Sequence, residues 1–287
     1  MELLQLKYFC DAAETENFSR TAQSYHIPPS AVSQAVKRLE TELGVSLFDR
    51  TSNKLRLNAR GRLLYEHARQ ALSLLEEAER RLRDKDGAIG GEIKLLVSAN
   101  RRLLTAAIER FREAHPDTVF RVDHRAEEPL DSYDIIISDD LSLSHGRKRR
   151  LLIEEDILLA VEQNNPLARA AKVRPADLSE ENFVSMNESS RLGRILEQIC
   201  RDNGFAPRIT VRSDDPFYVR QYVALSLGIT LVPSVSWQGL FPANVVLKSI
   251  GDHRRYTYAF WHEDRYISRA VALFLETLEE CCRNIGK

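Results

Sequence analysis

The chain has 287 residues, of which 41 are basic and 42 acidic, and its formal net charge is −1. This length allows two or more domains with cores of their own, and the balanced charge alone indicates no nucleic-acid partner. The four cysteines, Cys10, Cys200, Cys281 and Cys282, form no CxxC pair. Their spacing therefore excludes a zinc signature and a disulfide framework.

Charged residues interrupt the N-terminal region, and no stretch is long and apolar enough to span a membrane. We therefore expect a soluble, cytoplasmic protein with reduced thiols. The seven histidines show no ligand spacing, so neither a metal nor a cofactor is expected. The sequence contains no GxSxG, Walker A or GxGxxG motif, which argues against an enzyme.

Residues 17–43 predict two short helices joined by a tight turn, with Pro29 or Ser30 at the start of the second. The second helix has an apolar stripe with spacings of four, three and four: Val32, Val36, Leu39 and Leu43. Its separate outward face carries short hydrogen-bonding groups and a cation: Ser30, Ser33, Gln34 and Lys37. Such a face suits the major groove of DNA. Asn17 and Ser19 are good N-caps for the first helix of the pair.

A basic hairpin follows this pair of helices. Residues 17–69 contain nine basic and four acidic residues, which gives +5 in a nearly neutral chain. A local positive surface is what phosphate binding requires. Charge alone leaves an ordinary solvated surface as an equal alternative.

Residues 59–86 predict one long helix with a heptad seam. The seam consists of Leu64, Ala68, Ala71, Leu75, Ala78 and Leu82. We expect this helix to pair two subunits; the alternative is an amphipathic helix that lies on its own domain. Asp86, Gly87, Gly90 and Gly91 then predict a hinge.

After the hinge, strands and helices alternate, which predicts a mainly parallel sheet with helices on both faces. The predicted strands are 93–97, 119–122, 134–137, 156–161, 183–185, 209–212, 229–232 and 256–261. The predicted helices are 103–114, 192–203, 218–226 and 267–282.

This pattern resembles the LysR-type transcriptional regulators over essentially the whole chain. The N-terminal matches are Leu6, Phe9, NFSRTA at 17–22, SAVSQ at 30–34, KRLE at 37–40, LGV at 43–45, LF at 47–48 and Arg50. The C-terminal matches are FREAHPD at 111–117, PLA at 166–168, DL at 177–178, and Gly228-Ile229 to Pro233. Two positions depart from the family pattern: Pro29 stands where Gln is frequent, and Asn58 stands where Thr is usual. Asn58 can still cap the following helix.

The resemblance implies an α/β protein in three parts. Residues 1–58 would form a winged helix-turn-helix DNA-binding domain, and residues 59–90 a linker and dimerisation helix with a hinge. Residues 91–287 would form a two-lobed α/β effector-binding domain of the periplasmic-binding-protein type. Its first lobe would comprise about 91–160 and 262–287, and its second lobe about 161–261.

The resemblance also implies the contacts with promoter DNA. The helix-turn-helix residues expected to contact DNA are Ser19, Pro29, Ser30, Ser33, Gln34, Lys37 and Arg38. Arg50 and Lys54 would be contacts of the wing. The other implied partners are a second copy of the chain, in a homodimer or homotetramer, and RNA polymerase.

A small-molecule effector is expected between the two lobes. The turn formed by Ser98, Ala99 and Asn100 precedes a helix, so its hydroxyl, amide and backbone donors suit an anion. Arg101 and Arg102 could add charge, although at least one of them is expected to be solvated. On the facing lobe the candidate contacts are Asn187, Ser189, Asp215 and Phe217.

Two charged motifs are better explained by structural roles than by a binding or catalytic site. Adjacent residues such as Asp139 and Asp140 point to opposite faces of a strand end, which favours a turn or surface role over a metal or acid pair. The run GRKRR at 146–150 is expected to be an exposed loop or an oligomer contact. Two other functions stay open: an α/β enzyme tethered to DNA, and an architectural DNA-binding protein without a ligand.

Overall fold

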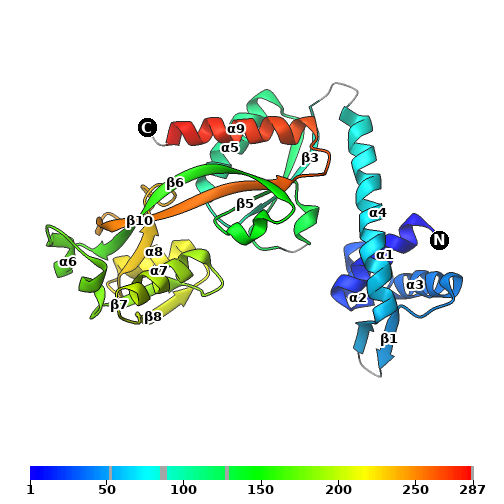
Figure 1. Cartoon of the computed structure of the whole chain (residues 1–287), viewed down its shortest axis with the longest axis horizontal. Helices are drawn as coiled ribbons and strands as arrows, with labels where there is room; N and C mark the ends of the chain where they lie inside the picture. The colour runs from blue at the N-terminus through cyan, green and yellow to red at the C-terminus, as the bar shows by residue number, and fades with distance from the viewer. Residues whose placement is uncertain (52–53, 85–88, 127–128, 286–287) are drawn as a thin grey trace. The chain divides into compact units, whose positions relative to one another are not determined.

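The computed structural model describes residues 1–51, 54–84, 89–126 and 129–285. The chain divides into two compact units, residues 1–88 and 89–287 (Figure 1). In the described part, no helix combines the length and the apolar character needed to cross a lipid bilayer.

The first unit is a winged helix-turn-helix head followed by a long helix. It contains α1 (Leu3–Thr15), α2 (Phe18–Ser24), α3 (Pro29–Leu43), the antiparallel hairpin of β1 (Phe48–Thr51) and β2 (Lys54–Leu57), and α4 (Ala59–Asp84). Asn17 caps α2, because its side-chain oxygen accepts from the backbone N–H groups of Ser19 and Arg20 at 2.9 and 3.1 Å. Ser19 itself lies inside the helix, so the prediction of a cap was right for Asn17 alone.

The apolar stripe of α3 forms the centre of the head. Val32, Val36 and Leu39 are fully buried and share one cluster with Phe9 and Phe48. Burial of such side chains contributes about 1.5–3 kcal/mol each, which fixes α3 on α1 and the hairpin.

Leu43 does not belong to the buried stripe, contrary to the prediction. Its side chain is 39% exposed. The helix ends at this residue, and Gly44 takes the left-handed conformation at φ 66°, which turns the chain away before Leu43 can reach the core.

Asn58 caps α4, as predicted from the sequence. Its side-chain oxygen accepts from the N–H of Gly61 at 2.9 Å, and its amide nitrogen donates to the carbonyl of Ser46 at 2.9 Å. These two bonds fix the start of the long helix to the segment that leads into the wing.

The predicted seam of α4 divides into two parts. Ala68 is buried and Leu64 is half-buried against the head, together with buried Leu72. Leu75 and Leu82 are 49% and 65% exposed. Ala71 and Ala78 are exposed as well. The first half of the helix therefore packs on its own head, and the second half carries an uncovered apolar stripe.

A six-stranded sheet runs through the second unit in the order β4-β3-β5-β10-β6-β9. Its strands are β3 (Gly91–Val97), β4 (Thr118–Asp123), β5 (Ile135–Ser138), β6 (Arg147–Glu162), β9 (Thr230–Pro233) and β10 (Val245–His262). A separate parallel pair consists of β7 (Asn182–Met186) and β8 (Arg208–Ser213).

The prediction of a mainly parallel sheet was wrong for half of these pairs. The β3–β4, β3–β5 and β7–β8 pairs are parallel, but β10 is antiparallel to both β5 and β6, and β6 is antiparallel to β9. The difference arises because β6 and β10 are 16 and 18 residues long and run beside each other in opposite directions. The sequence indicated only six residues of each.

Two hydrophobic clusters define two lobes in this unit. In the first lobe, α5 (Arg101–Ala114) and α9 (Arg269–Ile285) cover the sheet of β3, β4 and β5. In the second lobe, α7 (Arg191–Asp202) and α8 (Pro216–Ala224) pack with β7, β8 and β9. The strands β6 and β10 contribute side chains to both clusters and pass from one lobe to the other (Figure 1).

Short segments complete the lobes. The second lobe also contains α6 (Pro166–Arg169) and the 3₁₀ turn η3 (Pro175–Leu178). In the first lobe, η1 (Leu130–Ser132) and η2 (Leu141–Ser144) supply Leu130 and Leu143 to a small cluster around Tyr133 and Phe260. These 3₁₀ turns cover the sheet face opposite α5 and α9, where an α-helix was expected.

The basic run at 146–150 is not a loop, because Arg147 begins β6. Arg149 lies over the ring of Tyr258, and Arg150 lies over Trp261 and forms an ion pair with Glu279. In the described part of the chain, β9 pairs with β6 only at 157–160, so the first-lobe half of β6 has a free edge. Charged side chains on such an edge oppose pairing with other chains.

Replacement of Gly61 by alanine is expected to destabilise the head. A Cβ at this position would overlap the carbonyl oxygen of Leu47, whereas a Cβ at Gly44 meets open space. Gly61→Ala should cost about 3 kcal/mol, the upper end for forced overpacking. Gly44→Ala should cost ~1 kcal/mol for its left-handed backbone.

Urea denaturation of the full chain measures the effect of Gly61→Ala. The chain has two tryptophans, Trp237 and Trp261, and both lie in the second unit. The circular-dichroism transition should therefore shift to lower urea in the variant while the tryptophan fluorescence transition stays in place. An unchanged circular-dichroism curve would contradict the close contact at Gly61.

Candidate functional site

The outward face of α3 presents polar side chains that the fold does not use. Gln34, Lys37 and Arg38 are exposed and line one groove, and Ser30 is exposed one turn earlier. Ser33 is half-buried. Within the described part of the chain, the side chains of Gln34, Lys37 and Arg38 have no hydrogen-bond or ion-pair partner. This face therefore offers free donors for base edges and phosphates.

The other predicted DNA-binding residues lie on α2, at the start of α3 and on the two strands of the wing. Ser19 is exposed on α2, and Pro29 is the first residue of α3. Arg50 lies on β1 opposite Leu55, and Lys54 begins β2 opposite Thr51. The side chains of Arg50 and Lys54 lie outside the described part of the chain.

A cavity of about 320 Å³ opens between the two lobes of the second unit. Its walls include six residues that the sequence predicted: Ser98, Ala99, Asn100, Arg101, Asp215 and Phe217. The other lining residues are Arg102, Met186, Ser190, Leu192, Pro216, Arg220, Ser236, Trp237, Leu240 and Arg255.

Asn187 and Ser189 do not line this cavity. The N–H of Asn187 bonds to the carbonyl of Ser213 at 2.9 Å, and the N–H of Ser190 bonds back to the carbonyl of Asn187 at 2.8 Å. Ser190, at the end of this turn, does line the cavity. The predicted loop therefore borders the cavity through Ser190.

Three helices begin at the cavity wall. The N-cap residues of α5, α7 and α8 are Asn100, Ser190 and Asp215, and all three line the cavity. The side chains of Asn100 and Ser190 make no capping bond, so they leave backbone N–H groups of α5 and α7 available. Free N–H groups and helix dipoles at such ends attract anions.

Asn100 is committed to the protein framework. It adopts a left-handed backbone at φ 56°, and its side chain is buried. The amide lies 2.9 Å from Thr257 Oγ1 on β10 and 2.6 Å from Ser236 Oγ, which follows β9. The predicted effector contact of Asn100 therefore reduces to its backbone, because its amide joins both lobes.

The proton count around Ser236 fixes the orientation of the Asn100 amide. Ser236 Oγ lies 2.6 Å from both Asn100 Oδ1 and Glu155 Oε1, but a hydroxyl has one proton and Glu155 can only accept when ionised. Rotating the amide by 180° lets its nitrogen donate to Ser236 Oγ and its oxygen accept from Thr257. The hydroxyl of Ser236 then donates to Glu155 and accepts from Asn100.

A buried ion network lies beside this amide. Arg255 Nε donates to Asp139 Oδ2 at 2.7 Å, and Arg255 Nη1 lies 3.7 Å from Glu155 Oε1. Glu155 Oε2 accepts from the backbone N–H groups of Val235 and Ser236 at 3.0 and 2.8 Å. The charge of Arg255 is therefore already compensated on the protein side of the cavity.

The surface role predicted for Asp139 was wrong, since its carboxylate is buried on Arg255. Asp140 does face the other way, as expected for adjacent residues. It caps η2 through the N–H of Ser142 at 3.0 Å, and this backbone hydrogen bond lowers the pKa of the Asp140 carboxyl.

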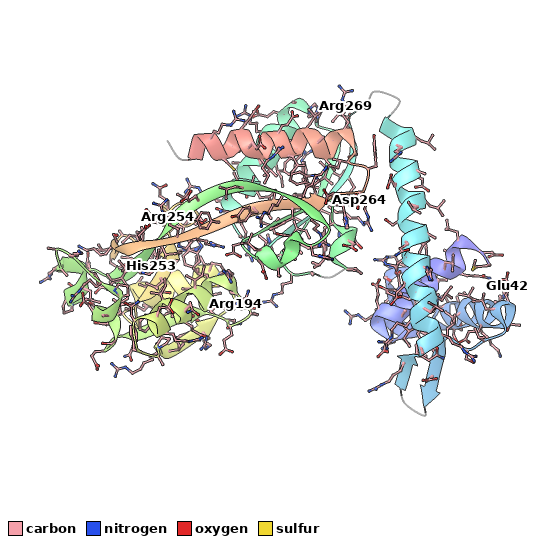
Figure 2. All side chains as sticks on the ribbon, in the orientation of Figure 1. Glu42, Arg194, His253, Arg254, Asp264 and Arg269 are labelled. Carbon is pink, nitrogen blue, oxygen red and sulfur yellow. The ribbon has the colours of Figure 1, made fainter. Side chains whose placement is uncertain are left out.

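Asp140 also contributes to a link between the lobes. Its carboxylate lies 3.8 Å from the guanidinium of Arg194, which is labelled on α7 in Figure 2. Arg125, which follows β4, forms a second interlobe ion pair with Asp214, which precedes α8. All four groups are substantially solvated, so each pair contributes little to stability.

Arg220 is the cation that the sequence did not reveal. It lies on α8 among buried Val219 and Val223, and its guanidinium lies 5.1 Å from the ring centre of Trp237. In the described part of the chain its Nε is buried without a hydrogen-bond partner. Burial lowers the pKa of Arg220, and the nearby charge of Asp215 opposes this effect. The one sequence feature that could have indicated this site is a single arginine within an otherwise uncharged helix.

The thiols are not arranged for redox chemistry. Cys10, Cys200 and Cys281 are buried, and Cys282 is half-buried. Burial raises the pKa of the Cys200 thiol to about 11. Neutral thiols of this kind are poor nucleophiles.

Known protein families match both the part of the chain that contains the outward face of α3 and the part that contains the interlobe cavity. Residues 3–62 match the bacterial regulatory helix-turn-helix protein, lysR family, and residues 87–283 match the LysR substrate binding domain. The chain is 27% identical to the transcriptional dual regulator GltC of Bacillus subtilis, covering 84% of each chain. It is 29% identical to a hydrogen peroxide-inducible genes activator of Dickeya chrysanthemi, covering 82% of this chain and 80% of that one.

The solved structures show the same architecture. The full-length regulator CbnR in complex with its target DNA superposes with a TM-score of 0.64 at 20% identity, covering 99% of this chain and 100% of that one. The two family matches together span almost the whole sequence, in the predicted order. The chain therefore belongs to the LysR family of transcription regulators, which are not enzymes but bind promoter DNA under the control of a small-molecule effector.

Proposed function

We propose that this regulator responds to a small anion bound in the interlobe cavity. The observation that carries the proposal is Arg220 in the cavity wall, whose Nε is buried without a hydrogen-bond partner among the described residues. A buried N–H donor without a partner is costly, and a bound carboxylate would offset that cost through charge-assisted hydrogen bonds. The free N–H groups at the starts of α5 and α7 add further hydrogen-bond donors, which carry a partial positive charge and also favour an anion.

Each part of the chain has its own role in this proposal. Residues 1–58 read promoter DNA in the cytoplasm, residues 59–90 pair two subunits, and residues 91–287 bind the effector. The bases are read by Ser30, Ser33 and Gln34. The phosphates are contacted by Ser19, Lys37, Arg38 and the wing residues Arg50 and Lys54, with Pro29 setting the start of α3.

The effector acts by a shift between lobe arrangements. A ligand changes an equilibrium only by binding one arrangement better than the other. Its contacts would come from both lobes, with Arg101 on the first and Arg220 on the second. Ligand binding would therefore favour one lobe angle, and the paired subunits would transmit that angle as a change in the spacing of their DNA-binding heads.

Peroxide sensing is not proposed, although one relative is a hydrogen peroxide-inducible genes activator. Such sensing needs an accessible thiolate. The raised pKa of Cys200 keeps its thiol protonated, and the side chain is buried.

Gln34→Ala should weaken binding to the cognate promoter by roughly 1–3 kcal/mol and relax the preference at one base pair. Gln163→Ala is the matched control, because Gln163 is an exposed glutamine of the second unit. Footprinting and titration of operator variants measure both effects. Unchanged affinity and unchanged base preference would remove Gln34 from the DNA interface.

Leu75→Asp should separate the paired subunits. A carboxylate in the seam of α4 would be buried without a partner, which costs about 3 kcal/mol, or more than a hundredfold in the dissociation constant. Ser73→Asp adds the same charge to the same helix outside the seam. Light scattering after gel filtration gives the masses, and a Leu75→Asp protein that keeps the mass of the wild type would exclude this seam as the interface.

Arg220→Met should remove the response to anions without loss of stability. The change removes a buried N–H donor that has no partner and keeps the apolar length of the side chain, so the free energy of unfolding should stay within about 1 kcal/mol of the wild type. Organic acids that raise the melting temperature of the wild type should bind the variant about tenfold or more weakly. Arg169→Met, on α6 and away from the cavity, is the control. A variant that keeps the full thermal shift would contradict the proposal.

A further inference from the structure

We infer that the effector is an amphipathic monoanion, with one carboxylate on an apolar body. This inference rests on the proposed function, because it assumes that the interlobe cavity binds an anion. It adds the chemistry of the remainder of the ligand and excludes compact polyanions such as phosphate and small dicarboxylates.

The second lobe supplies an apolar wall to the cavity. This wall consists of Met186, Leu192, Pro216, Phe217, Trp237 and Leu240. The first lobe contributes mainly polar groups, from Ser98 to Arg102. A ligand that contacts both walls therefore needs a polar end and an apolar end.

Two side chains of the apolar wall are poorly covered by the protein. Phe217 is 51% exposed and Leu240 is 44% exposed, although both line the same cavity. Single exposed apolar residues are common on protein surfaces, but two on one concave wall indicate a shared apolar contact. The body of a ligand between them would remove both side chains from water.

The charges at the cavity leave room for one anionic group. Arg255 is compensated by Asp139 and Glu155, and Arg102 donates to the carbonyl of Gln238 at 2.7 Å. Arg220 is half-buried, and among the described residues its buried Nε has no hydrogen-bond partner.

Other charges at the cavity disfavour a second anionic group. Asp215 adds a negative charge to the wall of the second lobe. Arg101 is exposed, so water screens its charge. A second carboxylate inside the cavity would therefore lack a desolvated partner and would face Asp215, which is unfavourable.

Calorimetric titration of the full-length protein with five probes tests the inference. The probes are 3-phenylpropionate, hexanoate, succinate, inorganic phosphate and the neutral 3-phenyl-1-propanol. We expect 3-phenylpropionate or hexanoate to bind at least about tenfold more tightly than the other three, since each combines one charge with an apolar body. Arg220→Met should abolish this preference over the neutral alcohol.

Two neighbouring aromatic residues provide a matched pair of variants. Phe217→Ala should weaken binding of 3-phenylpropionate by about tenfold, as expected when a large apolar contact is lost. Tyr218→Ala should leave it unchanged, because Tyr218 is also 51% exposed on α8 but does not line the cavity. Trp237 fluorescence in a Trp261→Phe background follows the same binding independently, since it leaves one tryptophan, located in the cavity wall.

The outcomes separate this inference from the proposed function. Tighter, Arg220-dependent binding of succinate or phosphate would overturn the monoanion inference and leave the anion site standing. Equal binding of 3-phenyl-1-propanol, or no binding of any acid, would overturn both. Equal effects of Phe217→Ala and Tyr218→Ala would overturn the role of the apolar wall.

Discussion

The second unit, residues 89–287, is the regulatory unit, and its structure depends on the buried contact of Arg255 with Asp139 and Glu155. These groups come from β10, the end of β5, and β6, so the network fixes the place where the long strands pass between the lobes. Removal of one partner from such a network costs about 3–5 kcal/mol, because a charge is left uncompensated away from water. The carboxylate of Glu155 also accepts hydrogen bonds from the N–H groups of Val235 and Ser236. These bonds attach the segment after β9 to the same network.

This network also determines which cavity groups are free to bind a ligand. Ser236 and Asn100 are engaged with Glu155 and Thr257, so the polar groups nearest the strands already have partners. Arg220 belongs to a different element, and its guanidinium lies over the ring of Trp237. In the proposed function, stability and anion recognition therefore depend on separate cations, Arg255 and Arg220, so that Arg220 can be replaced while the lobes keep their arrangement.

The sequence predicted the head more completely than the regulatory unit, for physical reasons. The start of α3 at Pro29 and the cap at Asn58 depend on local contacts that a short segment specifies. The lengths of β6 and β10 depend on their pairing with each other. Charged residues alternate along these strands, and in the sequence alone such a pattern is typical of an exposed loop. The cavity loop at Ser98 followed from its position before a helix, whereas the Arg220 site depends on tertiary burial that spacing cannot express.

The passage of β6 and β10 through both lobes has a consequence for synthesis on the ribosome. The sheet of the first lobe needs β10 between β5 and β6, and its core needs Phe274 and Leu278 from α9. The first lobe can therefore complete its core only after α9 has emerged, and the second lobe needs β10 as far as Ile250, while the head needs only residues up to α4. Since domains fold as units during translation, a nascent chain acquires a folded DNA-binding head before it acquires a cavity able to regulate that head.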